Sequence, residues 1–574
     1  MQASDWIAKF LASQRVEAVY EVVGGMIANF IDALHRDDQV RIVACHHEQA
    51  AGFAAEGHAR MNGIPGVAMG TSGPGAINLL TALGSCHFDS TPAVFITGQV
   101  NRSEQKRDRP IRQLGFQETD VVAMAAPIAK AAMRVDTIEE LPLRLTEAFA
   151  LACAGRPGPV LVDIPLDLQR LEVDAPLPEL PAAAAPAGRE QPIDGAAITR
   201  ILDDLQRAER PLILAGGGLR AGQAVDSFRE AVDRMGVPVV NSLMGVDALP
   251  FEHPLRVGLI GTYGNRWANI ALSRCDALLV LGSRLDIRQT GADTDAFAAG
   301  RTIHHVDCDP GEVNNRVTGC HALIAQLSTA TAALARAAGE YPSGSHEDWR
   351  QEIGELAQTW PDTGELVGIE GINPNLLMHQ LSGQQSVVAY VADVGQHQMW
   401  AAQSLELDAH QRFLTSGGMG AMGSGLPMAV GAAVAGRGPT VLIAGDGGFQ
   451  LNIQELQTIA RNNLPVKMVV LDNDCHGMVR QFQESYFDRR YQSTLWGYSA
   501  PEFVAVAAAY EIPGRRVEEP ADVAIAIEEM WTAAGPYLLE VAIDMNANAY
   551  PKIAFGHPIS EMEPFVAPKA MEGT

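Results

Sequence analysis

The segments VLIAGDGG, residues 441–448, and VKMVVLDN, residues 466–473, decide the fold of this chain. Each contains an apolar run of strand length. Between them lie apolar residues at helical spacing: Ile453, Leu456, Ile459 and Ala460. Asn452 precedes this helix and Glu455 follows three residues later, which predicts a capping interaction at its start. We therefore expect a strand–loop–helix–strand unit whose two strands are parallel.

The carboxyl ends of two such strands lie side by side, which places Asp446 and Asn473 at one edge of the sheet. A carboxylate oxygen, an amide oxygen and a backbone carbonyl just after Asn473 suit a hard, octahedral cation that also holds a diphosphate. The alternative is an ordinary βαβ unit with a glycine-rich turn.

Composition narrows the class of protein. The chain has 574 residues and a formal net charge of −26, which argues against nucleic acid and anionic membranes as partners. Its seven cysteines form no CxxC pair, so we expect reduced thiols and a cytoplasmic protein. Residues 1–20 predict an amphipathic helix without the features of a signal peptide, and no run is long and apolar enough to cross a bilayer.

Two linkers divide the chain. Residues 172–192 are rich in Pro and Ala, and residues 341–372 are polar with Pro and Gly. They predict three domains, at 1–170, 193–340 and 372–574. Each block alternates short apolar runs with helical segments, so we expect an α/β protein with three doubly wound parallel sheets.

Motifs in all three blocks resemble the thiamine diphosphate (ThDP) enzymes, and within them the acetohydroxyacid synthase (acetolactate synthase) group. The Gly-Asp-Gly…Asn pattern is one. The others are HEQAAG (47–52), TSGPG (71–75), DSTP (89–92), GFQE (115–118), GRPGPV (155–160), DVGQHQMW (393–400), SGGMGAMG (416–423) and GMVRQ (477–481). The resemblance implies the three-domain fold of these enzymes: a pyrimidine-binding domain, a middle domain and a diphosphate-binding domain.

The resemblance also implies roles for single residues. Glu48 matches the carboxylate that acts on the cofactor's pyrimidine ring, and Met422 matches the apolar wedge that bends the cofactor. The Gly420 carbonyl matches the partner of the cofactor's 4′-amino group. Asp446, Asn473 and the carbonyl of Cys475 match the Mg²⁺ ligands. The remaining positions that match ThDP contacts are Gly24, Gly25, Thr71, Pro74, Asn78, Gln396, His397, Gly445, Gly447, Gly448, Gly477 and Met478.

An enzyme of this kind decarboxylates a 2-oxoacid, here expected to be pyruvate, and adds the resulting acyl carbanion to a second carbonyl. Phe116 and Gln117 match residues beside the reacting carbon, and Arg288 matches an arginine that binds the acceptor's carboxylate. Val479 also falls in the substrate pocket of the family.

The family binds FAD in its middle domain without using its redox chemistry, so we expect FAD here. The matching positions are Arg156, Gly216, Gly217, Gly218, Leu243, Met244, Gly282, Arg284 and Asp307. On its own, Gly216-Gly217-Gly218 is only a tight turn after a strand.

The chain departs from the family around the acceptor pocket. Phe482 stands where the family has Trp, and Met26 stands where it has Ala. Leu166 and Ile287 replace a Lys and an Asp of the family pattern. These changes leave open a C–C lyase or hydrolase of a diketone, or an acyltransferase.

A simple 2-oxoacid decarboxylase would carry a His pair near residues 112–117, and this chain has none there. A flavin oxidase and a non-catalytic binding subunit are further alternatives; intact Glu48, Asp446 and Asn473 argue against the second. The resemblance implies a homodimer or homotetramer with active sites shared between subunits. It leaves the regulatory subunit undetermined.

Overall fold

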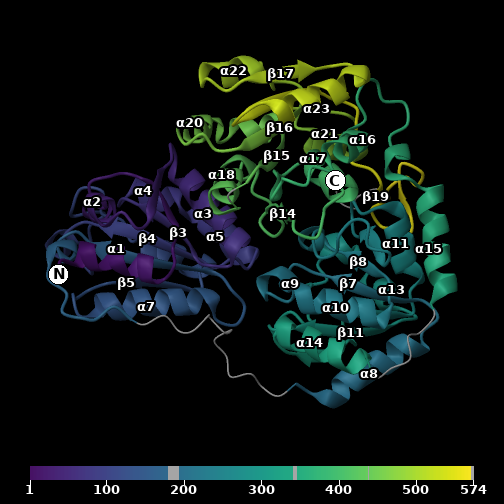
Figure 1. Cartoon of the computed structure of the whole chain (residues 1–574), viewed down its shortest axis with the longest axis horizontal. Coiled ribbons are helices and arrows are strands. Elements are labelled where there is room, and N and C mark those ends of the chain that lie inside the picture. Colours follow the sequence, from purple (N-terminus) through teal and green to yellow (C-terminus); the bar gives the residue numbers. More distant parts are fainter. Residues whose placement is uncertain (179–192, 340–345, 437, 570–574) are drawn as a thin grey trace.

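Three six-stranded sheets, each all-parallel, form the framework of the computed structural model, which describes residues 1–178, 193–339, 346–436 and 438–569 (Figure 1). The expected α/β architecture with three parallel sheets is confirmed. Parts of the two predicted linkers, residues 179–192 and 341–345, lie outside the described residues.

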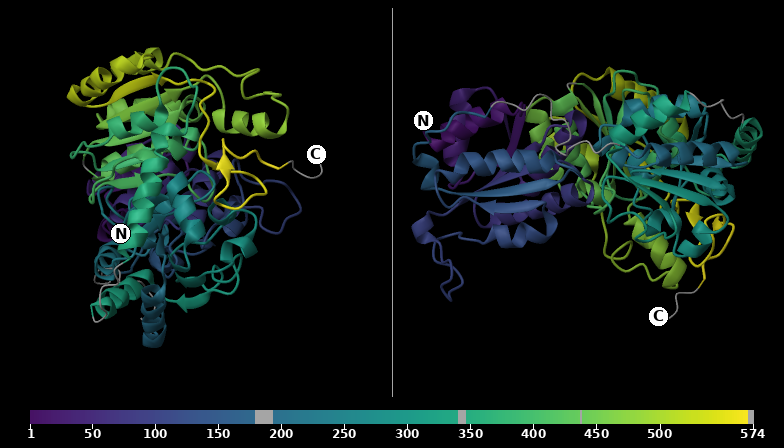
Figure 2. Two further views of the ribbon diagram at one scale, coloured as in Figure 1. Left: turned by 90° about the vertical axis from the view of Figure 1, so that its right-hand side faces the viewer. Right: turned by 90° about the horizontal axis from the view of Figure 1, so that it is seen from below.

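The first sheet has the order β2-β1-β3-β4-β6-β5. Its strands are β1 (Ala18–Val22), β2 (Arg41–Ala44), β3 (Gly66–Gly70), β4 (Ala93–Gln99), β5 (Ala131–Arg134) and β6 (Pro159–Pro165). Its helices are α1 (Ala3–Ser13), α2 (Ala28–Asp37), α3 (Glu48–Asn62), α4 (Pro74–Asn78), α5 (Leu80–Phe88), α6 (Val121–Ala125) and α7 (Glu140–Cys153). Helices lie on both faces of this sheet (Figure 2). The predicted helix over 1–20 is too long: α1 ends at Ser13, Arg15 turns the chain with a left-handed φ of 60°, and the β-prone Ala-Val-Tyr run joins β1.

The middle sheet has the order β12-β11-β10-β7-β8-β9. Its strands are β7 (Pro211–Ala215), β8 (Val239–Asn241), β9 (Arg256–Leu259), β10 (Ala277–Leu281), β11 (Thr302–Asp307) and β12 (His321–Ile324). The helices are α8 (Gly195–Arg207), α9 (Gly218–Ala221), α10 (Val225–Met235), α11 (Arg266–Arg274), α12 (Ile287–Thr290), α13 (Thr294–Ala298), α14 (Leu327–Ala338) and α15 (Glu347–Thr359).

The third sheet, β14-β13-β15-β16-β18-β17, repeats the strand order of the first. Its strands are β13 (Ala389–Ala392), β14 (Arg412–Leu414), β15 (Thr440–Gly445), β16 (Val466–Asp472), β17 (Gly514–Val517) and β18 (Tyr537–Ala542). The helices are α16 (Pro374–Leu381), α17 (Gln396–Ser404), α18 (Gly425–Gly436), α19 (Asp446–Gln450), α20 (Leu456–Arg461), α21 (Gly477–Tyr486), α22 (Phe503–Ala509) and α23 (Val523–Thr532). A hairpin of β19 (Lys552–Ile553) and β20 (Met562–Glu563) follows.

The strand–helix–strand unit predicted from residues 441–473 is confirmed, since β15 and β16 pair in parallel. The predicted capping interaction at Asn452 does not form, so that prediction is wrong. Its amide nitrogen instead donates to the carbonyl of Gly423 at 2.7 Å. The Glu455 carboxylate accepts the backbone N–H groups of His46 and His47, at 2.9 and 3.1 Å. Both histidines belong to the unit built on the first sheet.

The first and third units share one hydrophobic core, which includes Phe53 and Phe95 from one and Phe449 and Phe503 from the other. Helices α3 and α18 cross at the centre of this contact with their backbones touching. A Cβ at Gly431 would lie 1.9 Å from the carbonyl oxygen of Ala54. A Cβ at Gly57 would likewise lie 2.2 Å from the Met428 carbonyl oxygen, so the close approach of the two helices requires glycine at both positions.

Candidate active site

The first set of predicted site residues gathers at the carboxyl edge of the first sheet. Glu48 is the opening residue of α3, whose start is capped by His47. The Glu48 carboxylate accepts a hydrogen bond from the Asn78 amide at 3.0 Å. A Cβ at Gly75 would lie 3.2 Å from the same carboxylate, so this glycine leaves space beside it. Thr71 lies on the next turn and accepts the backbone N–H of Met26 at 3.2 Å.

The loop before residue 118 presents Phe116 and Gln117. Gln117 has a left-handed φ of 65°, an unfavourable conformation for a residue with a side chain, and such strain concentrates at functional sites. Glu118 holds the loop, because its carboxylate accepts the backbone N–H groups of Leu114, at 2.7 Å, and Lys106. The Phe116 side chain is 82% exposed in the single chain.

The second set lies at the carboxyl edge of the third sheet. Helices α17, α19 and α21 all begin there, at Gln396, Asp446 and Gly477. Helix N-termini carry unpaired N–H groups and a partial positive charge, so three at one edge suit a diphosphate. Asn473 donates to the side-chain oxygen of Gln396 at 3.3 Å, and a Cβ at Gly477 would lie 1.9 Å from that oxygen.

Asp446 is buried, and burial raises the pKa of its carboxyl to about 7. The Tyr498 hydroxyl donates to it at 3.0 Å. Burial also raises the pKa of the Cys475 thiol to about 12, so Cys475 would offer a cation its backbone carbonyl rather than a thiolate. Within the described ranges no three His, Cys, Asp or Glu side chains cluster as a metal site. A cation at Asp446 would therefore depend on Asn473, a carbonyl and the oxygens of a bound diphosphate, which fits the Mg²⁺ prediction.

His397 supplies an independent sign of a ligand at this edge. Its ring is buried, its Nε2 atom has no hydrogen-bond partner among the described residues, and burial lowers its pKa to about 3. A buried polar atom without a partner is costly unless a ligand meets it. The neutral imidazole therefore fits a contact with the diphosphate.

Met422 lies on a loop next to this edge and is partly exposed. The buried carboxylate of Asp393 accepts the backbone N–H groups of Gly423, at 2.9 Å, and Gly425, at 3.2 Å. A Cβ at Gly448 would lie 2.1 Å from that carboxylate and 3.4 Å from the Met422 side chain. The Gly-Asp-Gly-Gly turn thus packs directly against the base of the Met422 loop.

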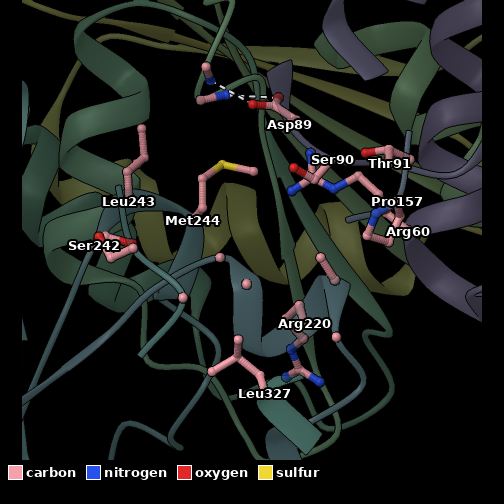
Figure 3. Close-up of a pocket in the computed structure, with 18 of the residues that line it drawn as sticks. Arg60, Asp89, Ser90, Thr91, Pro157, Arg220, Ser242, Leu243, Met244 and Leu327 are labelled. Carbon is pink, nitrogen blue, oxygen red and sulfur yellow. Dashed lines mark hydrogen bonds between the residues drawn. The ribbon is translucent and has the colours of Figure 1, made fainter. Parts of the chain in front are cut away.

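A cavity of about 770 Å³ lies between the middle unit and its two neighbours. Most of the residues predicted for FAD line it: Arg156, Gly217, Gly218, Leu243, Met244, Gly282, Arg284 and Asp307. Figure 3 shows Leu243 and Met244 on one side and Ser90, Pro157 and Arg60 on the other. Gly216 is not among the lining residues; a Cβ there would lie 2.1 Å from the Gly282 carbonyl oxygen, so it serves close packing.

Two arginines of this cavity are paired with acids. Arg156 bonds Asp309 and Glu312, and Arg220 bonds Asp247. Arg288, which sequence analysis assigned to the acceptor's carboxylate, also lines the cavity. Glycine backbone beside guanidinium groups fits a dinucleotide with a diphosphate, and the volume falls in the range of cofactor sites.

Three residues of the site were not singled out from the sequence. Tyr498 contacts the Asp446 turn, and Asp393 contacts one end of the Met422 loop. Asp89 contacts the other end of that loop. Asp89 and Asp393 stood within quoted motifs without a role, whereas Tyr498 lies in a loop that carries no local signal.

All three units match one family. Residues 1–124 match the N-terminal TPP binding domain of thiamine pyrophosphate enzymes, residues 198–334 match the central domain, and residues 393–541 match the C-terminal TPP binding domain. The chain belongs to the thiamine pyrophosphate (ThDP) enzyme family.

Within that family the chain resembles acetolactate synthases. It is 38% identical to acetolactate synthase isozyme 2 large subunit of Escherichia coli K12, over 98% of this chain and 99% of that protein. It is 35% identical to the isozyme 1 large subunit of the same organism, over 97% of each chain. With the chloroplastic acetolactate synthase of Arabidopsis thaliana the identity is 35%, over 97% of this chain and 83% of the other.

Two remaining expectations concern the whole chain. All seven cysteines, each in a described range, are free of disulfides. No helix in the described part of the chain has the length and hydrophobicity to span a membrane.

Proposed function

We propose that the protein is a ThDP- and Mg²⁺-dependent carboligase of the acetolactate synthase type. It decarboxylates a 2-oxoacid, pyruvate in the first instance, and adds the acyl unit to a second carbonyl. The observation that carries this proposal is the presence of both residue sets, around Glu48 and around Asp446, in a chain that resembles acetolactate synthases over its whole length. ThDP, when bound, supplies the carbanion and accepts the electrons released with carbon dioxide.

The chain's own residues bind the cofactor, hold a proton on it and exclude water from the site. Glu48, oriented by Asn78, holds a proton at the pyrimidine nitrogen of the cofactor. Asp446 and Asn473 hold the cation, and the helix N-termini beside them bind the diphosphate. Met422 packs against the cofactor from the apolar side, while Phe116 and Gln117 keep water away from the reacting carbon.

Ligation rather than simple decarboxylation is supported by the loop 112–117, which holds no histidine that could protonate the intermediate carbanion. Incubating the purified protein with ThDP, Mg²⁺ and pyruvate should release carbon dioxide and form acetolactate or a related acyloin. Free acetaldehyde as the only product would contradict the ligase reaction. Cleavage of a diketone in the same screen would favour the lyase alternative, for which Met26 and Phe482 leave room.

The role of Glu48 has its own test. Replacing it by Gln keeps the hydrogen bond to Asn78 possible but removes the charge, so we expect activity to fall about a hundredfold or more. The thermal midpoint should remain close to that of the wild type. Unchanged turnover in this variant would remove Glu48 from the mechanism.

We also propose that FAD occupies the cavity lined by Gly217, Gly282 and Arg284. Its role there is to fill space between the units, since the carboligation needs no net oxidation. An absorbance spectrum of the purified protein with flavin maxima supports this, and a colourless protein that takes up no added FAD contradicts it.

The active site is proposed to form between two copies of the chain. In the described residues of one chain no hydrogen bond joins the Glu48 set to the Asp446 set, and Phe116, Val479 and Phe482 are exposed. Mixing the inactive variants Glu48→Gln and Asp446→Asn gives mixed dimers with one intact site out of two. After random exchange we expect about a quarter of wild-type activity. No recovery in confirmed mixed dimers would place both residues in a site within one chain.

A further inference from the structure

The loop that carries Met422 is attached at both ends to carboxylates. Asp393 of the third unit accepts the N–H groups of Gly423 and Gly425 at its far end. At its near end Asp89, just after α5 of the first unit, accepts the N–H of Gly417 at 3.1 Å and of Gly418 at 2.6 Å. The dashed lines in Figure 3 mark these two bonds. The two domains therefore hold the loop from opposite sides.

The near attachment leaves no room for side chains. A Cβ at Gly418 would lie 2.9 Å from the Asp89 carboxylate and 3.0 Å from the Phe88 side chain. A Cβ at Gly417 would lie 2.3 Å from the sulfur of Met244, which belongs to the middle unit. All three units thus meet at two consecutive glycines, four and five residues before Met422.

Asp89 and its two glycines also form part of the wall of the cavity assigned to FAD. Met244, which touches Gly417, lines the same cavity. The loop is therefore continuous from the cavity wall to the residue that packs against ThDP. The wall of the cavity and Met422 therefore lie on one short stretch of backbone.

The charge at Asp89 is set by a second carboxyl group. Glu56 on α3 is fully buried, and neither of its oxygens has a hydrogen-bond partner among the described residues; Ser85 approaches it without the geometry of a bond. Burial raises the pKa of Glu56, and the neighbouring Asp89 raises it further. Burial raises the pKa of Asp89 as well, whereas the nearby Arg60 and the two N–H donors oppose that rise and favour the ionised form. Because Glu56 has no such donors, it holds a proton more tightly than Asp89, and we assign the negative charge to Asp89.

Arg60 completes this arrangement. Its guanidinium lies 3.9 Å from the Glu56 carboxyl and donates to the carbonyl of Thr415 at 2.6 Å, two residues before Gly417. The cation thus balances the single negative charge and holds the start of the same loop.

We propose that Asp89 is a positioning residue for the reaction: its carboxylate fixes the backbone at Gly417 and Gly418, and through it the position of Met422 at the ThDP site. This role rests on the proposed function of Met422. It predicts that the cavity and the ThDP site are coupled through Asp89, although Asp89 belongs to neither set of site residues predicted from the sequence.

Asp89→Asn tests the proposal, because an amide nitrogen cannot accept one of the two N–H groups and points a donor at it. We expect kcat to fall about tenfold to a hundredfold while the pyruvate KM changes little, as for a small misplacement of a catalytic group. ThDP should bind more weakly, and the near-ultraviolet circular dichroism of the bound cofactor should change. Asp38→Asn, an exposed substitution in the same unit, is the matched control. A folded Asp89→Asn protein with wild-type kcat, ThDP affinity and dichroism overturns the proposal.

A second measurement uses the wild-type protein and so does not depend on how the variant folds. Hydrogen exchange of the Gly417 and Gly418 amides should be strongly protected, with or without substrate. Exchange at the rate of an unstructured peptide would overturn the attachment. Hydrogen exchange, ThDP affinity and dichroism need no turnover, so a protein that binds ThDP but forms no acetolactate would refute the proposed function while leaving the attachment open to confirmation.

Discussion

Tyr498 is expected to control how well the protein binds its metal ion. Its hydroxyl donates to Asp446 at 3.0 Å and accepts from the Gln450 amide at 3.3 Å. Its ring contacts the His476 ring, with the centroids 4.4 Å apart and the ring planes tilted by 57°. Replacing Tyr498 by Phe removes the hydroxyl and keeps this ring contact, so it isolates the bond to the proposed Mg²⁺ ligand.

The expected size follows from that one bond. A hydrogen bond to a charged group contributes about 1.5–3 kcal/mol, and about 1.4 kcal/mol corresponds to a factor of ten in affinity. Partners that orient metal ligands change metal affinity by about 10–100-fold when they are removed. Because Asp446 would lose the hydrogen bond from the Tyr498 hydroxyl, we expect the half-saturating Mg²⁺ concentration to rise by at least about tenfold.

The assay is a Mg²⁺ titration of metal-stripped protein at saturating ThDP, followed by intrinsic fluorescence and by turnover. Tyr491→Phe is the matched control, because Tyr491 lies in the same loop and its hydroxyl makes no hydrogen bond to any described residue. Turnover at saturating Mg²⁺ should largely recover in Tyr498→Phe. Equal Mg²⁺ dependence in the two variants and the wild type would refute the orienting role of the hydroxyl.

Three further substitutions test the pocket, the buried charge and the helix crossing. Phe482→Trp should raise the preference for 2-oxobutyrate over pyruvate as acceptor at least about threefold in a competition assay, and an unchanged product ratio would remove Phe482 from the pocket. Because burial raises the pKa of Glu56, the folded protein is fully stable while Glu56 is protonated at low pH and loses stability as the pH rises. Glu56→Gln should therefore raise the thermal midpoint by about 2 °C or more near pH 9 and by little near pH 5. A difference that does not depend on pH would contradict burial of an ionisable group. Gly431→Ala should lower stability by about 1–3 kcal/mol in denaturant unfolding, because its Cβ would meet the Ala54 carbonyl, whereas Gly354→Ala has open space and should be neutral or stabilising; equal effects would contradict the close crossing.

The sequence predicted the framework because the relevant signals are local. Apolar runs such as 441–444 and 466–471, each next to a glycine-rich turn or a helical pattern, reflect buried parallel strands, and burial on both faces demands such runs. The resemblance then fixed the order of the three units, because its motifs follow the carboxyl ends of these strands.

The errors arose where contacts between distant parts of the chain override local rules. Asn452 and Glu455 have the spacing of a capping pair, but Asn452 bonds Gly423 and Glu455 bonds the backbone at His46 and His47. Tyr498 lies 52 positions from its partner Asp446, and Asp89 lies 329 positions from Gly418. No local sequence pattern predicts contacts over such separations. Such pairs become visible only in the folded structure.

The distribution of exposed apolar side chains explains why a single chain would be a poor enzyme. Val479 and Phe482 on α21 are 51% and 41% exposed, and Phe116 projects from another unit. A carboligase must exclude water from its reacting carbon, since protonation there ends in a simple aldehyde. Water can reach these side chains in the isolated chain, whereas contact with a second copy would bury them beside Glu48 and Asp446. Dilution below the dissociation constant of the dimer should therefore lower total turnover and also raise the share of acetaldehyde among the products. A constant product ratio across that range would show that closure of the site does not depend on the partner.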